Sequence, residues 1–277
     1  MAGAARSLVN LAGRPIDALH AARRPATVIT LIYHRIGLRS PSPVDLDEAV
    51  LLEQLDILAA SSRVVSLGEA VDRLSDPPSA EGSPRVVITV DDGTADWPDV
   101  LMPALVDRAL PATFYVSTDF VESKRSFPDE GAPVSWQGLA DMVSTGLATI
   151  GSHTHTHRVM HDLAAGEARD EVDRSVGLIE DRLGLTPRHF AYPKAIAPSA
   201  AAEVVVRRRF DSAVLAGNRG AAPGDDAHRL GRHALTVADD ASSFRRKIDG
   251  GMWLEGWLRE RRDAWQVRRA ARPSPVR

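Results

Sequence analysis

Val86-Val87-Ile88-Thr89-Val90-Asp91-Asp92-Gly93 joins an apolar run of strand length to two carboxylates and a glycine. A short run of this kind, rich in β-branched residues, is typical of a buried strand. The adjacent carboxylates can face the same way only if the backbone bends, and Gly93 allows that bend. Asp-Asp-Gly is also common in ordinary turns. The stretch therefore predicts a strand that ends either in a pair of functional carboxylates or in a simple turn.

Short apolar runs and helical segments alternate on both sides of this stretch. One helix begins with a capping box, Ser66 with Glu69, and another has an apolar stripe at Val172, Val176 and Ile179. The pattern predicts an α/β fold, a distorted or incomplete (β/α) barrel of about seven parallel strands. Reactive groups are then expected at the carboxyl ends of the strands. The expected strands are residues 28–33, 86–90, 113–116, 148–150, 189–192, 213–215 and 234–237.

The expected organisation is one catalytic domain with a short extension at each end. Residues 75–84 and 217–228 are rich in Pro, Gly, Ala and Asp and predict loops, but neither is long enough to separate two domains. We therefore expect an N-terminal arm over residues 1–27, a catalytic domain over residues 28–250, and a basic amphipathic helix with a tail over residues 251–277.

Composition narrows the class of protein. The chain has 277 residues, of which 44% are hydrophobic, a net charge of −3 and no cysteine. The weak net charge argues against a nucleic-acid partner, and the lack of cysteine excludes disulfides and thiolate chemistry. We find neither the continuous apolar stretch of a secretory signal nor a transmembrane segment, so a cytoplasmic enzyme is expected.

The two ends of the chain leave one alternative open. The arm carries arginines among the apolar residues Leu8, Leu11, Ile16 and Leu19, and the last segment carries many arginines around Trp253, Trp257 and Trp265. Each end either packs on the domain or rests on a membrane surface, the C-terminal helix against acidic lipid headgroups. Peripheral membrane contact through the termini is therefore an expectation alongside simple packing.

Gly151-Ser152-His153-Thr154-His155-Thr156-His157 is the second informative stretch. His153 and His157 are four residues apart, a spacing that places two imidazoles on one side of a helical turn, with His155 pointing away. The hydroxyls of Thr154 and Thr156 are then expected to orient the imidazoles. The alternative is an exposed polar turn. Two histidines and an aspartate form a zinc-type ligand set with one open position, and the other aspartate remains free as a base.

Several motifs together resemble a known family. Residues 88–93 resemble the Thr-Phe-Asp-Asp-Gly motif of the polysaccharide deacetylases of carbohydrate esterase family 4, the nodulation-factor deacetylase homology domain. Residues 112–116 resemble the strand that follows this motif. Residues 134–139 and 150–157 resemble the approach to, and the body of, the family's His-Thr/Ser-x-x-His motif. The resemblance spans most of residues 28–245.

This resemblance implies a bound divalent metal, usually zinc, and hydrolysis of the N-acetyl group of an amino sugar. By position, Asp91 would be the general base, and the metal ligands would be Asp92, His153 and His157. The tetrahedral oxyanion would be held by the metal and by a backbone N–H. The segment Tyr192-Pro193-Lys194 would provide that donor, with the amide of Lys194 in the corresponding place.

One motif departs from the family pattern. Where the family usually has Arg-x-Pro-Tyr, this chain has Ala191-Tyr192-Pro193-Lys194, so the arginine that orients the base is absent there and Arg232 is the candidate replacement. Phe-Ala-Tyr-Pro resembles the branch that includes the poly-N-acetylglucosamine deacetylases, whose general acid is a histidine in the first strand. His34 is therefore our first choice for the acid, and His233 is the second.

The sequence thus predicts a metal-dependent carbohydrate N-deacetylase that acts on an amino sugar or glycan, which is either a polysaccharide or a small or lipid-linked acceptor. Two alternatives remain. Related barrels hydrolyse amides or imides of non-sugar substrates, and the altered segment at Ala191 is compatible with a catalytically inactive glycan-binding module.

Overall fold

The structure is a computed structural model that describes residues 15–17, 19, 26–75, 83–128, 131–258 and 261 of the chain. Seven strands form a closed barrel in the order β1-β4-β5-β6-β7-β8-β9, and every neighbouring pair is parallel. The strands are β1 (Val28–Tyr33), β4 (Arg85–Asp92), β5 (Ala112–Val116), β6 (Ala148–Ser152), β7 (His189–Ala191), β8 (Ser212–Ala216) and β9 (Leu230–Ala234). The predicted distorted (β/α) barrel is confirmed.

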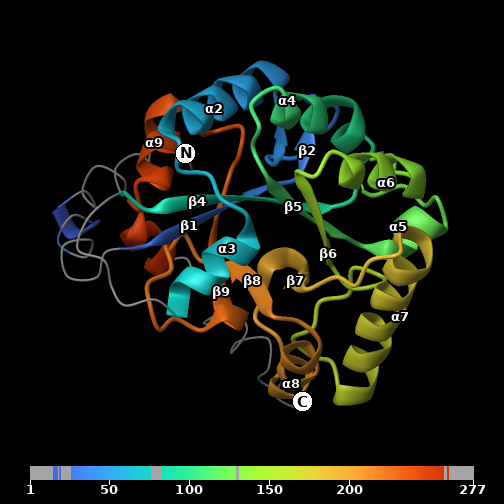
Figure 1. The fold of residues 1–277 in the computed structure, drawn as a ribbon. Helices are drawn as coiled ribbons and strands as arrows, with labels where there is room; N and C mark the ends of the chain where they lie inside the picture. The colour runs from blue at the N-terminus through green and yellow to red at the C-terminus, as the bar shows by residue number, and fades with distance from the viewer. Residues whose placement is uncertain are drawn as a thin grey trace, which may run out of the picture.

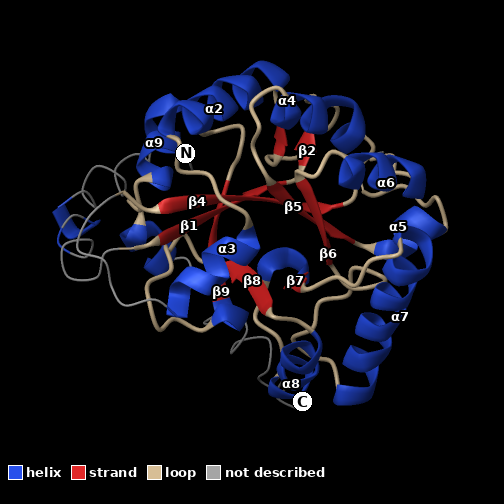
Figure 2. Ribbon diagram, viewed as in Figure 1, coloured by secondary structure: helices blue, strands red, loops and turns tan. Residues whose placement is uncertain are grey.

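Helices cover the outside of the barrel (Figures 1 and 2). They are α2 (Glu48–Ser61), α3 (Leu67–Asp72), α4 (Met102–Val106), α5 (Thr118–Glu122), α6 (Trp136–Ser144), α7 (Ala165–Leu183), α8 (Ala200–Arg209) and α9 (Ala241–Ile248). Short helical turns are η1 (Arg73–Ser75), η2 (Trp97–Leu101), η3 (Pro193–Ala195) and η4 (Ala227–Arg229), and β2 (Arg35–Ile36) pairs with β3 (Asp45–Leu46). The predicted capping box at Ser66 and the helix carrying Val172, Val176 and Ile179 are both present.

Strand alternation separates two kinds of surface. In β4, Val86, Ile88 and Val90 face the helices in the main hydrophobic core, whereas Val87 belongs to a separate cluster inside the barrel. Successive side chains of a strand point to opposite faces, so Thr89 and Asp91 share the inner face with Val87. The inner face of the barrel is therefore apolar toward the amino ends of the strands and polar near their carboxyl ends.

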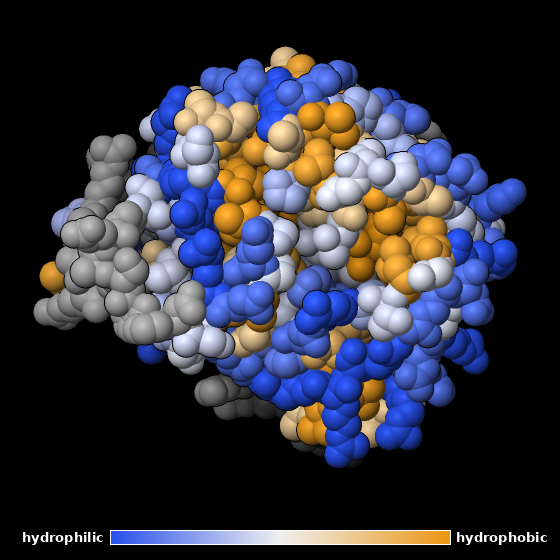
Figure 3. All heavy atoms as spheres, in the orientation of Figure 1, coloured by the Kyte–Doolittle hydropathy of each residue, from blue (hydrophilic) through white to orange (hydrophobic). Residues whose placement is uncertain are grey.

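Helix α3 closes the end of the barrel at which the strands begin. Its Leu67 and Ala70 pack with Val28, Val87 and Leu230, which lie at or near the starts of their strands. Figure 1 shows α3 across the middle of the barrel, in front of the strands. On this face, hydrophobic residues gather near the centre and polar residues surround them (Figure 3). The opposite end, formed by the carboxyl ends of the strands, holds the polar side chains.

The last strand differs from the prediction. We expected it over residues 234–237, but β9 spans Leu230–Ala234 and ends where the predicted strand begins. The error has a physical cause, because Gly231, Arg232 and His233 lack the apolar character of a barrel strand. Arg232 is nevertheless fully buried inside the barrel, since a carboxylate from β4 pairs with it there.

The predicted extensions lie largely outside the described residues, as do residues 76–82 of one predicted loop and the C-terminal residues from 262 onward. Among the described residues, Asp17 accepts hydrogen bonds from the backbone N–H groups of Met252 and Leu254, each at 3.0 Å. An early residue of the chain thus contacts the start of the helical residues 253–258. Within the part of the chain that the structure describes, no helix is both long and apolar enough to span a bilayer.

Candidate metal centre and active site

Four barrel strands bring polar side chains to one place. By alternation, His34 after β1, Asp91 on β4, His153 after β6 and Arg232 on β9 all occupy inward positions at the carboxyl ends of their strands. Gly151, two residues before His153, leaves space for the Tyr115 ring, because a Cβ at this glycine would lie 2.5 Å from Tyr115 Cδ1. The strand pattern itself therefore assembles the site.

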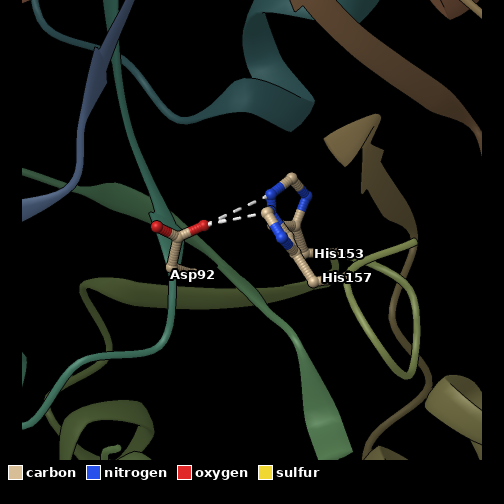
Figure 4. A group of neighbouring side chains, drawn as sticks. All are labelled: Asp92, His153 and His157. Carbon is tan, nitrogen blue, oxygen red and sulfur yellow. Dashed lines mark ion pairs between the residues drawn. The ribbon is translucent and has the colours of Figure 1, made fainter. Parts of the chain in front are cut away.

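Asp92 reaches the site by breaking this alternation. Strict alternation would place its side chain on the outer face with Val90. Its backbone instead adopts a φ of 89°, and Gly93 follows with a φ of 113°. A positive φ is uncommon for a residue with a side chain and is often found at functional sites. The turn aims the Asp92 carboxylate at two imidazoles, as Figure 4 shows.

Asp92, His153 and His157 form a compact group with one ligand atom each. Asp92 Oδ1 lies 3.6 Å from His153 Nε2 and 3.4 Å from His157 Nε2, and all three ligand atoms lie within 4.8 Å of one another. Zinc bonds of about 2.0 to 2.1 Å in a tetrahedron separate two ligand atoms by about 3.3 Å. The donor types and spacings therefore fit a divalent cation with a position left open, and this is the set that the sequence predicted.

Residues 153–157, called the histidine loop below, do not have the helical form that the sequence suggested. Residues 153–157 form no helix, and Thr154 and His157 have positive φ values of 65° and 61°. The two imidazoles converge because the loop is tightly bent. His155 does point elsewhere, with Nδ1 at 3.0 Å from the Thr118 hydroxyl and Nε2 at 3.9 Å from Asp119.

A backbone carbonyl orients His153. Its Nδ1 lies 2.7 Å from the Ala191 carbonyl oxygen, which can only accept a hydrogen bond. Nδ1 therefore carries the proton, and the lone pair of Nε2 faces Asp92, as a metal ligand requires. Among the described residues, neither the Thr154 nor the Thr156 hydroxyl hydrogen-bonds directly to a ligand imidazole. Thr156 bonds to Glu171 of α7, and the buried Thr154 hydroxyl has no hydrogen-bond partner among the described residues.

The electrostatics of the site favour a cation. Burial lowers the pKa of His153, but Asp91 and Asp92 raise it more strongly, so its pKa lies above the ordinary value. Burial also lowers the pKa of His157 to about 4, and neighbouring His153 adds to this effect. His157 is therefore neutral near pH 7 and available as a ligand. The raised pKa of His153 reports the negative potential that would also attract a metal ion.

Asp91 is held by a bidentate contact with Arg232. Arg232 Nη1 donates to Asp91 Oδ1 at 2.6 Å and Nη2 to Oδ2 at 2.7 Å, with both side chains buried. Nη1 also donates to the Thr89 hydroxyl at 3.1 Å, and the guanidinium lies over the Tyr115 ring. Burial raises the pKa of Asp91, but Arg232 and His153 lower it by more than burial raises it, so the pKa lies below its ordinary value and the carboxyl is ionised at neutral pH.

His34 lies beside this group. Burial lowers its pKa, whereas the charges of Asp92 and Asp91 partly oppose the shift. The backbone of His34 is fixed by the segment that follows Asp92, since Trp97 Nε1 donates to the His34 carbonyl at 3.2 Å. His34 Nδ1 is buried without a hydrogen-bond partner among the described residues.

The second choice for the acid, His233, does not reach the site. It follows Arg232 in β9, and alternation turns its ring outward under α9. It is fully buried next to Lys247 and Asp239. Burial lowers the pKa of His233 to about 3, with a further contribution from Lys247. Parity along the strand is the physical reason that the two neighbouring residues lie in different places.

The segment after β7 reaches the site only in part. The Tyr192 ring faces outward against Phe190, and its backbone N–H donates to Val214 O at 3.2 Å, so neither group points at the metal ligands. Lys194 follows Pro193, is exposed, and has a φ of 54°. Its charge contributes to the lowered pKa of His157, which places it near the ligands.

Sequence reasoning missed several supporting residues. Thr89 could have been found from alternation, since it lies two residues before Asp91. Glu171, Trp97 and Tyr115 come from distant parts of the chain, and no local signal marks them.

Comparisons with known proteins agree with this fold. Residues 79–210 match the family model described as polysaccharide deacetylase. The fold is therefore a (β/α) barrel of the polysaccharide deacetylase type. The predicted resemblance to the polysaccharide deacetylase family is confirmed by this match. A search of curated proteins finds no match.

Solved structures share this fold. IcaB from Ammonifex degensii is 25% identical, with a TM-score of 0.68 over 83% of this chain and 97% of that one. The deacetylase PplD from Streptococcus pyogenes, solved with acetate, has a TM-score of 0.70 at 19% identity over 81% of this chain and 99% of that one. A de-N-acetylase from Aggregatibacter actinomycetemcomitans has a TM-score of 0.65 at 19% identity over 79% and 99%. The similarity to IcaB supports the poly-N-acetylglucosamine deacetylase-like branch.

Proposed function

We propose that the protein is a metal-dependent hydrolase that removes the N-acetyl group from an amino sugar of a glycan. The convergence of Asp92, His153 and His157 beside the ionised Asp91 carries the proposal. When bound, a divalent cation, with zinc the expected one, would polarise the acetyl carbonyl and lower the pKa of water at the site. The family match and the resemblance to IcaB support an amino-sugar substrate.

The residues of the chain divide the proton transfers between them. Asp91 takes a proton from the attacking water as that water adds to the acetyl carbon. Its low pKa makes it a weak base, so the reaction depends on an acidified water. His34 then gives a proton to the sugar nitrogen as the carbon–nitrogen bond breaks. The products are acetate and the free amine, and Arg232 holds Asp91 in place throughout.

The backbone N–H of Lys194 is the proposed donor to the oxyanion. Lys194 lies near His157, and its positive φ turns the chain at this point. The alternative of an inactive glycan-binding module was suggested by Ala191. The structure weakens that reason, because Arg232 approaches Asp91 from β9 instead.

Acetate release from N-acetylglucosamine oligomers tests the proposal. The purified protein should release acetate, lose activity with a chelator, and regain it with zinc or cobalt. Replacing the base in Asp91→Asn should lower kcat by about 10² to 10⁴-fold. Full turnover by the metal-free protein would reject metal dependence. Sugar binding without acetate release by the metal-loaded protein would favour the binding module, and hydrolysis confined to non-sugar amides would favour the amide or imide hydrolase.

A further inference from the structure

Helix α7 contacts the end of β6 and the histidine loop through two side chains one turn apart. Glu171 Oε2 accepts from the Thr156 backbone N–H at 2.8 Å, and Oε1 accepts from the Thr156 hydroxyl at 2.7 Å. Ser175, four residues later, bonds through its hydroxyl to the Ser152 hydroxyl at 2.8 Å. Glu171 is a buried residue with 9% exposure. The helix therefore holds the end of β6 and the middle of the loop that follows it.

This loop needs such support because its backbone is strained. Thr154 and His157 both adopt positive φ values, and each such residue costs on the order of 1 to 3 kcal/mol. His153 follows directly from β6, and the Ala191 carbonyl fixes its ring. His157 lies four residues farther along and depends on the path of the loop. The residue immediately before it, Thr156, is the one that Glu171 holds.

We propose that Glu171 is a positioning residue for the metal centre, one that fixes Thr156 and thereby keeps the His157 imidazole directed at Asp92. The inference rests on the proposed function for the identity of the bound group. Without the two hydrogen bonds, the loop relaxes toward ordinary backbone angles and His157 Nε2 moves away from Asp92 Oδ1. A ligand held less well in place binds a metal ion more weakly.

The two contacts act through hydrogen bonding rather than through charge. A glutamine at position 171 can still accept from the Thr156 N–H with its amide oxygen. Its amide nitrogen can donate to the Thr156 hydroxyl, which rotates to accept. An alanine provides neither contact and leaves the Thr156 N–H without this partner.

Metal affinity tests this role without requiring catalysis. Glu171→Ala, Glu171→Gln and a control, Asp173→Ala, are prepared as full-length proteins. Asp173 is an exposed carboxylate on the same helix. Zinc affinity is measured by competition with a chromophoric chelator, and the visible spectrum of bound cobalt reports ligand geometry. Glu171→Ala should bind zinc about 10 to 100-fold more weakly and show an altered cobalt spectrum. Glu171→Gln and Asp173→Ala should resemble the wild type.

Two results would overturn the proposal. One is a folded Glu171→Ala protein with wild-type zinc affinity and cobalt spectrum. The other is a Glu171→Gln protein that loses as much affinity as Glu171→Ala. If Glu171→Ala does not fold, Thr156→Val decides, because it keeps Glu171 and removes one hydrogen bond; unchanged affinity in that variant would also reject the role. Failure of the wild-type protein to bind metal would instead reject the proposed function.

Discussion

Arg232 and His233 are consecutive residues of β9, both fully buried, yet they belong to two different polar clusters. Arg232 points into the barrel and pairs with Asp91 beside the metal ligands. His233 points outward beneath α9, next to Lys247 and Asp239. Lys247 Nζ lies 2.7 Å from Asp239 Oδ1 and donates to the Ala234 carbonyl at 2.6 Å. Each cluster thus contains a buried cation paired with a buried carboxylate.

The comparison separates burial from function. Both ion pairs are removed from water, so loss of either cation leaves a carboxylate uncompensated. The inner pair also sets the charge and direction of the proposed base, whereas the outer pair holds the end of β9 against α9. Matched substitutions in the two pairs should therefore cause similar losses of stability and different losses of catalysis.

Of the matched substitutions, Arg232→Met should have the largest combined effect on stability and catalysis. The free energy of unfolding should fall by about 3 to 5 kcal/mol, because Asp91 is left buried and unpaired. The folded fraction should lose about 10 to 100-fold in kcat/KM, since Asp91 is no longer held in place. Removal of the guanidinium raises the pKa of Asp91, so the acidic limb of the pH profile should move to higher pH. Urea unfolding and pH-dependent acetate release measure these effects.

Lys247→Met should destabilise the protein by a similar amount, about 3 to 5 kcal/mol, because Asp239 loses its buried partner. The kcat/KM of the folded protein and its pH profile should stay as in the wild type. The same urea and acetate assays apply. A shifted pH profile in Lys247→Met would show that the two clusters are coupled through β9. It would contradict the conclusion that only the inner ion pair affects catalysis.

The same strand shows how far the sequence could predict the fold. Runs of β-branched and aromatic residues marked β1, β4 and β5 because their outer faces pack in the main core. β9 was misplaced because Gly231, Arg232 and His233 have no such pattern. Arg232 is buried only because Asp91, 141 positions away, neutralises it. A pairing of this kind exists in the tertiary structure and leaves no local periodicity.

The residues that form the site could be predicted from the sequence, whereas most of the residues that hold them in place could not. Carboxylate and imidazole chemistry, together with motif spacing, identified the residues that converge. The helical turn expected for His153 and His157 was wrong, because positive φ values at Thr154 and His157 bend the loop, and Glu171 contacts the loop from a distant helix. Strand parity explains why His34 faces the ligands and His233 does not. This argument needs the observed start of β9, which the sequence misplaced.

The smallest predicted effect is the pH dependence of stability caused by His233, in the cluster beneath α9. His233 has a native pKa of about 3, against about 6.5 in an unfolded chain, because its ring is buried, with a further contribution from Lys247. Between these values the unfolded chain takes up a proton that the folded protein does not. Stability is therefore fully present above pH 6.5 and falls as the pH decreases toward 3, by up to about 1.4 kcal/mol per pH unit for this group.

His233→Phe removes this titration and leaves Lys247 and Asp239 in place. The two His233 ring nitrogens have no hydrogen-bond partner among the described residues, so the apolar ring should cost little at pH 7.5. Lowering the pH to 5 should weaken the wild type by about 2 kcal/mol more than the variant, judged from urea unfolding at both pH values. His189, with a pKa lowered to about 4, is present in both proteins and cancels in the difference. Equal losses in the two proteins would mean that His233 takes up a proton in the folded state, and the outer cluster would then be open to water, unlike the inner one.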